Sequence, residues 1–286
     1  MDPAAYILER QTAWARRHGI PLQGSQGDRG RPVYTATLEQ NLFEAVGADS
    51  LNEYNHGDGG ELRGNDGHPG KMQALHSSSA LCCNVFHYWR RTRRPEVIAR
   101  ACGLPSTGHV SLSFEQQFPI DAAQFRRAPN LDATFRYNTG ALDLVGVESK
   151  YCEPFSTRTH AGLSPAYLTP NCASFWRGWD ALRGLAEGLS PNNSEFEHLD
   201  APQLLKHLLG LRRNSTRGFR LLYLYNDAPG PVAAQHTVEV EQFVAIAAQD
   251  DVSVVPVTYQ DVIARLLRAG RDEDAAYLDY ISERYL

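Results

Sequence analysis

The sequence predicts an α/β fold with a mixed central sheet flanked by helices and with a helical N-terminal part. Residues 109–115 alternate polar and apolar side chains, which is typical of a half-buried strand. Residues 142–151 and 219–225 are instead apolar on both faces, as central strands are. The segments between the later strands have the periodicity of helices. Consecutive antiparallel strands, followed by strands that are joined through helices, indicate a mixed sheet covered by helices.

The composition is that of an ordinary globular protein. The chain has 286 residues, 42% hydrophobic and 21% charged, enough for one large domain or two small ones. We expect a single domain, in which an N-terminal helical and loop region (1–70) packs on a core (71–286). The sequence contains no run of 18 apolar residues, no visible secretory signal, and five cysteines without disulfide or zinc spacing. These features predict a cytoplasmic protein without membrane contact.

The charge distribution limits how nucleic acid can be bound. The net charge is −5, from 28 basic and 33 acidic residues, so a polyanion must be held by a local patch. Only three of the 28 basic residues are lysines, namely Lys71, Lys150 and Lys206. In a chain that uses arginine almost everywhere else, each lysine is a candidate for a specific role.

The N-terminal part is predicted to consist of helices joined by polar loops. Residues 3–18 have the spacing of an amphipathic helix. The long stretch 47–70 contains seven glycines, which is typical of a functional loop. A proline in the first turn favours a helix at 95–102. The other elements expected here are a loop at 19–36 and helices at 38–46 and 72–89.

The central and C-terminal parts are predicted to alternate strands and helices. The turn residues Asn138-Thr139-Gly140 join two strands into a hairpin. Strands are expected at 109–115, 131–137, 142–151, 219–225 and 252–257, and helices at 174–189, 201–212, 238–248 and 261–269.

A candidate active site lies at the end of the third strand. Glu148 and Lys150 are two residues apart, so both point to one face of the sheet. A turn centred on Thr139 would place Asp132 opposite Gly146, with Glu148 as its diagonal neighbour at about 7–8 Å. Two carboxylates and an ammonium then converge. The alternative is a structural Glu–Lys pair at a strand end, of about 1 kcal/mol or less if exposed.

The chemistry of this set is that of a magnesium site beside a lysine. Mg²⁺ needs only one or two protein carboxylates, with water and substrate phosphate completing its shell. The ion stabilises charge on a phosphodiester and activates a bound water. A nearby lysine can position that water, help to deprotonate it, or neutralise charge in the transition state. Asp143 has the opposite parity to Glu148 on the same strand, and we exclude it from the site.

These residues resemble a known catalytic motif. Pro129-Asn130-Leu131-Asp132, followed by Glu148-Ser149-Lys150, resembles the PD-(D/E)xK motif of the restriction-endonuclease-like nuclease superfamily. The order of elements is also similar to that superfamily's core. The segments 75–86 and 148–155 resemble a little-characterised bacterial group within it. Leu131 departs from the motif, because it stands directly before the Asp where the motif has Pro.

The resemblance implies a restriction-endonuclease-like fold and phosphodiester hydrolysis that depends on Mg²⁺, with Mn²⁺ as a substitute. Asp132, Glu148 and the Ser149 carbonyl would bind the metal, and Lys150 would assist the attacking water. The implied substrate is nucleic acid, foremost DNA, and many nucleases of this kind act as homodimers. Alanine at Asp132 or Glu148 is expected to abolish cleavage and to leave the fold intact.

Two further polar residues are candidates for the same site. Glu115 lies on the first strand, where similar nucleases often place an extra acid, but it is equally interpretable as a solvated strand residue. Gln203 begins the helix at 201–212, where related nucleases carry a Gln or Lys. The alternative for Gln203 is a polar residue among the free backbone groups of a helix start.

Basic runs are candidates for phosphate contact. The densest contains Arg90, Arg91, Arg93 and Arg94, which could grip phosphates or simply complement the C-terminus of a helix. A second cluster has the same two interpretations and consists of Arg212, Arg213, Arg217 and Arg220. Residues 55–58 (Asn-His-Gly-Asp) more often form a solvent-facing turn than a metal site.

Two functions from different classes therefore remain open. The first is a metal-dependent nuclease. The second is a catalytically inactive nuclease-like domain that binds nucleic acid or a protein partner.

Overall fold

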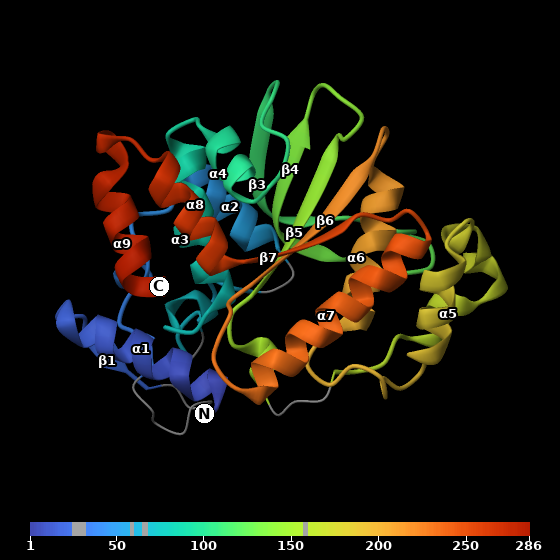
Figure 1. The fold of residues 1–286 in the computed structure, drawn as a ribbon, viewed down its shortest axis with the longest axis horizontal. Helices are drawn as coiled ribbons and strands as arrows, with labels where there is room; N and C mark the ends of the chain where they lie inside the picture. The colour runs from blue at the N-terminus through green and yellow to red at the C-terminus, as the bar shows by residue number, and fades with distance from the viewer. Residues whose placement is uncertain (25–32, 58–59, 65–67, 157–159) are drawn as a thin grey trace.

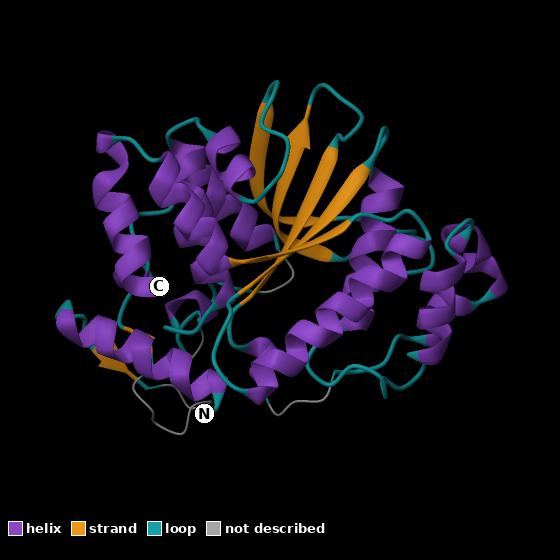
Figure 2. Ribbon diagram, in the orientation of Figure 1, coloured by secondary structure: helices purple, strands orange, loops and turns teal. Residues whose placement is uncertain are grey.

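The computed structural model describes residues 1–24, 33–57, 60–64, 68–156 and 160–286, and these form three layers (Figure 1). The middle layer is a five-stranded sheet in the order β3-β4-β5-β6-β7. Helices cover both of its faces (Figure 2). The strands are β3 (Val110–Gln117), β4 (Asn130–Tyr137), β5 (Leu144–Lys150), β6 (Phe219–Tyr225) and β7 (Val254–Thr258).

The sheet is mixed, as the sequence predicts. β3, β4 and β5 form an antiparallel meander, whereas β5, β6 and β7 run parallel to one another. Parallel neighbours need crossover connections, and helices α6 (Ala201–Asn214) and α7 (Pro231–Gln249) lie in the two crossovers. The predicted α/β, restriction-endonuclease-like architecture is therefore confirmed.

Two hydrophobic cores lie on the two sides of the sheet. In β6, Leu222 and Leu224 belong to one core, and Leu221 and Tyr223 belong to the other. This strand is therefore buried on both faces, as its continuous apolar sequence requires. The first core packs on α1 (Pro3–Arg17), α2 (Ala48–His56), α3 (Ser78–Arg91), α4 (Pro95–Ala101), α8 (Tyr259–Ala269) and α9 (Ala275–Tyr285), and the second on α5 (Asp180–Gly188), α6 and α7.

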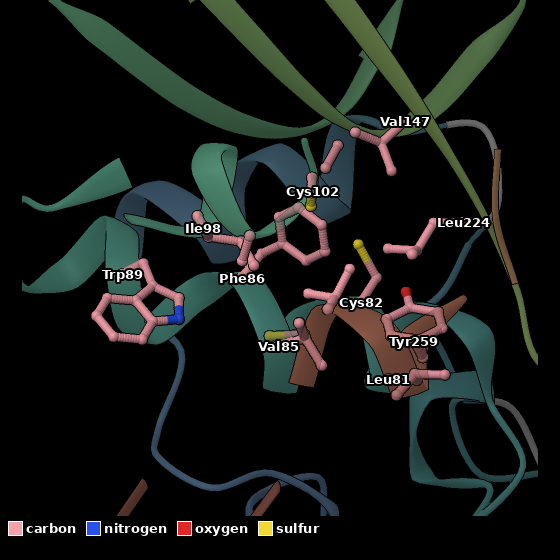
Figure 3. Packing of buried hydrophobic residues seen from close by; sticks show 14 of the residues in the cluster. Leu81, Cys82, Val85, Phe86, Trp89, Ile98, Cys102, Val147, Leu224 and Tyr259 are labelled. Carbon is pink, nitrogen blue, oxygen red and sulfur yellow. The ribbon is translucent and has the colours of Figure 1, made fainter. Parts of the chain in front are cut away.

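Helix α3 is the most deeply buried of these elements. Every residue from Ser79 to Trp89 is buried. Its Phe86 packs near Val147 of β5 and Leu224 of β6 (Figure 3). Ser77 caps the helix by accepting the N–H of Ala80 at 3.1 Å. The cap places the first turn of α3 against the end of β5.

The structure corrects several expected boundaries. The stretch 47–70 contains α2, whose only large apolar residues are Leu51 and Tyr54, too few for a periodic signal. The helix expected at 38–46 is a single 3₁₀ turn, η2 (Glu39–Asn41), and the expected start of α3 is another, η3 (Lys71–Gln73). The small sheet of β1 (Leu22–Gln23) and β2 (Tyr34–Thr35) and helix α9 were not expected.

The remaining 3₁₀ segments lie in the connections of the second half of the chain. Part of the helix expected at 174–189 is one of them, because Gly178, at a φ of +72°, interrupts the chain before α5. They are η4 (Glu153–Phe155), η5 (Pro165–Leu168), η6 (Pro170–Trp176) and η7 (Asp272–Asp274). Among the described residues, no helix is long and apolar enough to cross a membrane.

Candidate active site

Three adjacent strands each bring one carboxylate to the same level of the sheet. The pairs Phe114↔Ala133 and Gln116↔Leu131 of β3 and β4 flank Glu115, which therefore lies across from Asp132. The β4–β5 pairs end at Ala133↔Val147, and continuing this register places Glu148 across from Asp132. Glu115, Asp132 and Glu148 all line one cavity.

The hairpin register differs from the predicted one by two residues. Asp132 is aligned with Glu148 and not with Gly146, because the turn is not centred on Thr139. The N–H of Tyr137 donates to the Asp143 carbonyl at 3.0 Å, so the hairpin closes on a wider loop. A two-residue shift keeps the parity of every side chain. Asp132 and Glu148 therefore lie on the same face of the sheet, directly opposite each other.

Asp132 continues the pairing beyond the end of the β4–β5 ladder. Its Oδ2 accepts the backbone N–H of Ser149 at 2.7 Å. Burial raises the pKa of Asp132 well above its usual range, and the negative charges of Glu148 and Glu115 raise it further. The carboxylate therefore sits where a cation would relieve both effects.

The pKa of Glu148 is shifted in the opposite direction, because two basic side chains lie beside its carboxylate. Its Oε1 lies 2.6 Å from the Lys150 ammonium and its Oε2 lies 2.9 Å from His207 Nε2. Burial alone would raise the pKa of Glu148, but these two neighbours outweigh it and lower the pKa to about 2. The negative charge of Glu148 in turn raises the pKa of Lys150 despite its burial. The pair is therefore ionised at neutral pH.

Glu115 is a buried member of the site and not a solvated strand residue. Its side chain accepts a hydrogen bond from Asn130 Nδ2, and the residue is 5% exposed. Burial raises its pKa to about 7, with Glu61 and Glu148 contributing. Its φ of +50° is uncommon outside glycine, and such strain often marks functional sites. A Cβ at Gly57 would lie 2.6 Å from Glu115 Oε2, so Gly57 leaves room for this carboxylate.

Helix α6 supplies a second wall of the site. Asp200 caps the helix by accepting the N–H of Gln203 at 2.9 Å. Gln203 Oε1 then accepts from Lys150 Nζ at 2.9 Å, which brings this predicted candidate into the site. His207 was not predicted. Its signal was its position four residues after Gln203, on the same face of the helix.

All three lysines of the chain meet at this site. The cavity has a volume of about 760 Å³, and we call it the lysine cavity because Lys71, Lys150 and Lys206 line it. They come from three distant segments: η3, the end of β5 and α6. Since the rest of the 28 basic residues are arginine, this convergence distinguishes the lysine cavity from every other surface of the described chain.

The residues present fit a hard divalent cation with a small protein donor set. Among the described residues, no group of three or more Asp, Glu, His and Cys side chains is placed to hold a metal ion by itself. Asp132, Glu148 and the Ser149 carbonyl are nevertheless the donor types that Mg²⁺ accepts with water and phosphate. Among the described residues, no Lys, Arg or His forms an ion pair with Asp132, and burial together with the charges of Glu148 and Glu115 raises its pKa.

The predicted basic run does not reach the lysine cavity. Arg90 forms an ion pair with Glu53. Arg91 lies 2.7 Å from Glu44, and Arg94 pairs with Glu273 and Asp274. Arg93 is exposed in the turn after α3. The geometry of this run thus favours the structural interpretation, in which cations complete a helix C-terminus.

Other predicted candidates also have structural partners. Asp143 accepts the Thr216 hydroxyl at 2.7 Å, away from the site, as its parity indicated. Arg217 donates to the carbonyls of Tyr137 and Asn138, and Arg220 donates to Ser253. In the 55–58 segment, Asp58 lies outside the described residues.

Comparison with known proteins finds a matching family model. A family model described as restriction endonuclease associating with ARP matches residues 8–286. No curated protein and no solved structure matches the chain.

Proposed function

The chain belongs to the family of restriction endonucleases associating with ARP, and on that premise we propose that it is a metal-dependent nuclease that hydrolyses phosphodiester bonds in DNA. The observation that carries the proposal is the alignment of Glu115, Asp132 and Glu148 on adjacent strands, facing a cavity lined by all three lysines. Acids of this arrangement suit a divalent cation, and the lysines suit a polyanionic substrate.

Asp132, Glu148 and the Ser149 carbonyl would hold Mg²⁺, or Mn²⁺ in its place. The bound ion would polarise the phosphodiester and lower the pKa of a coordinated water. The N–H of Ser149 fixes the Asp132 carboxylate, and Lys150 and His207 fix that of Glu148. Both carboxylates are therefore oriented before substrate arrives, as an efficient site requires.

Lys150 and Glu115 would divide the electrostatic and proton-transfer roles. The raised pKa of Lys150 keeps its ammonium charged, which suits neutralisation of charge on the phosphate and not removal of a proton from water. Glu115, with a pKa of about 7, can take up or release a proton near neutral pH. We assign Glu115 to proton transfer and Gln203 to positioning Lys150.

The proposal is tested by cleavage of supercoiled plasmid, linear duplex, single-stranded DNA and RNA in Mg²⁺, Mn²⁺ and EDTA. Asp132→Asn and Lys150→Ala are each expected to reduce the metal-dependent rate by more than about 100-fold, since loss of an outer-shell partner alone costs about 10–100-fold. Asp279→Asn removes an exposed carboxylate on α9 and should cut like the wild type.

The negative result is equally informative. A folded protein that cuts none of the four substrates would contradict the nuclease proposal. It would support the alternative of an inactive nuclease-like domain that binds nucleic acid or a protein partner.

A further inference from the structure

A second pocket lies beside the C-terminal half of α6. It has a volume of about 320 Å³ and contains three arginines, so we call it the arginine pocket. Its other walls are apolar or weakly polar. It is lined by Ile120, Ser174, Phe175, Arg177, Leu209, Arg212 and Arg213.

The lining of the arginine pocket is positively charged. None of its described lining residues is acidic. Arg212 donates to the carbonyls of Phe175 (3.1 Å) and Arg177 (2.6 Å) and lies 4.3 Å from the centre of the Trp179 ring. Burial and the charge of Arg177 lower the pKa of Arg212, which indicates that the guanidiniums repel one another.

Asp250 is the carboxylate that partly offsets the charge of Arg212. However, its carboxylate accepts the N–H groups of Ala181 and Leu182, at 3.1 and 2.8 Å, at the start of α5. Arg177 and Arg213 are exposed. The pocket therefore presents two accessible guanidiniums over a third that is held rigidly by carbonyls, an arrangement that suits a phosphate group.

The arginine pocket and the lysine cavity are neighbours along one face of α6. Lys206, Leu209 and Arg213 are spaced i, i+3 and i+7, so they lie on the same face of the helix within about 10 Å. Lys206 lines the lysine cavity, and the other two line the arginine pocket. A ligand that extends along this face of α6 therefore meets both.

Two further segments also span both cavities. In the loop after β3, Ile120 lines the arginine pocket and Arg127 lines the lysine cavity. The ring of Phe125 in the same loop stacks on that of Tyr167, with 4.2 Å between the ring centres, and its centre lies 6.3 Å from that of the Phe175 ring. Tyr167 lines the lysine cavity and Phe175 lines the arginine pocket. The two cavities are thus connected by three elements, and the connecting surface carries Arg127, Lys206 and Arg213.

We infer that the arginine pocket binds a backbone phosphate of the substrate strand, outside the site of cleavage, and that this strand is single-stranded there. This inference rests on the proposed function. The phosphate would contact Arg177 and Arg213, while half-buried Phe175 offers a flat apolar surface to an unstacked base. A base paired in a duplex is stacked between its neighbours and cannot take up this position.

The test compares single-stranded and duplex DNA of one sequence, both 5′-labelled, by fluorescence anisotropy in EDTA over a series of salt concentrations. The variant is Arg177→Ala/Arg213→Ala, which leaves the pinned Arg212 in place. The matched control is Arg16→Ala/Arg268→Ala, which removes two exposed arginines from α1 and α8. Both variants change the net charge equally, so a general electrostatic effect would appear in both.

The pocket variant is expected to weaken single-strand binding by roughly tenfold relative to the control. The slope of log K against log salt should become shallower by about 0.7, since loss of one phosphate contact on a single strand contributes about 0.7. Duplex binding should change equally in both variants. Equal single-strand binding by the two variants, or an equal loss on duplex and single strand, would overturn the inference.

Cleavage by the same proteins in Mg²⁺ separates the inference from the proposed function. A wild type that does not cut, with single-strand binding lost only in the pocket variant, contradicts the nuclease and upholds the pocket. A wild type that cuts, with a pocket variant that binds and cuts equally well, upholds the nuclease and overturns the pocket.

Discussion

At the scale of single residues, three aligned carboxylates differ in their charge state because they differ in their neighbours. Glu148 has a lysine and a histidine within 2.9 Å, and its pKa falls to about 2. Asp132 and Glu115 are buried near other negative charges, and their pKa values rise. The effect of removing one of these carboxylates on the stability of the protein therefore depends on which one is removed.

We predict opposite stability changes for two isosteric variants in EDTA at pH 7. Asp132→Asn should stabilise the protein by about 1 kcal/mol, because it relieves repulsion and its Oδ1 can still accept the Ser149 N–H. Glu148→Gln should destabilise it by about 3 kcal/mol, because it leaves the buried Lys150 ammonium without its anion. Chemical denaturation measures both values.

This prediction refines the expectation that removing either acid leaves the fold equally intact. Asp279→Asn is the control for loss of a carboxylate and should change stability by less than about 0.5 kcal/mol. A Glu148→Gln variant as stable as the wild type would show that Glu148 is not anchored by Lys150, and a destabilised Asp132→Asn variant would show that Asp132 is not held against repulsion.

At the scale of elements, the site depends on how β4, β5 and β6 are joined. Asp143 precedes β5 and accepts the N–H of Thr216, at 2.9 Å, and that of Gly218, at 3.1 Å. Its own N–H donates to the Gly218 carbonyl at 2.9 Å. Burial alone would raise the pKa of Asp143, but the hydrogen bonds that its carboxylate accepts from the hydroxyl and N–H of Thr216 and from the N–H of Gly218 lower it to about 2. Asp143 thus fixes the start of the parallel β5–β6 pair.

Asp143→Asn should therefore destabilise the protein in a pH-dependent way. A depressed carboxyl pKa contributes stability above its unfolded value, near pH 4, and loses it as the pH falls through about 2. We expect a loss of about 1 kcal/mol at pH 7 that shrinks between pH 4 and 2, with the wild type as reference. Urea denaturation at several pH values measures this difference, and a pH-independent loss would contradict the assignment.

At the scale of the whole molecule, the last helix holds the first one in place. Arg284 of α9 is 2% exposed and lies 4.3 Å from the centre of the Trp14 ring. Its guanidinium donates to Gln11 Oε1 of α1 at 2.9 Å and to the Asn41 carbonyl at 2.8 Å. Gln11 Nε2 donates back to the Arg284 carbonyl at 2.8 Å. This buried cation is compensated by carbonyls and aromatic rings, and not by a carboxylate among its described contacts.

Arg284→Met should consequently lower the free energy of unfolding by about 3 kcal/mol, because it removes the donor that Arg284 supplies to the buried side-chain oxygens of Gln11 and Asn41. Arg17→Met is the matched control. Arg17 also contacts α9, but through an exposed pair with Glu283 at 3.8 Å, which is worth less than about 1 kcal/mol. Thermal denaturation distinguishes the two variants, and equal losses would show that the buried network is not what joins the ends.

The sequence alone was enough to predict the five strands of the main sheet and the helices that connect its parallel strands, since hydrophobic periodicity is a local property. It was also enough to bring Asp132, Glu148 and Lys150 together, because side-chain parity on a hairpin survives a two-residue error in register. The scarcity of lysine pointed to three residues that now line one cavity.

Only the tertiary structure decided which strand neighbours and helix faces complete that site. Glu115 could be a solvated residue until β3 was paired with β4, and His207 gained its role only when α6 was packed beside β5. Likewise, the acids that pair with Arg90, Arg91 and Arg94 come from α2, from Glu44 in the loop before α2, and from η7, all distant from these arginines in the chain. Charge pairing acts between residues far apart in the chain, so its outcome follows from the packing of elements and not from local sequence pattern.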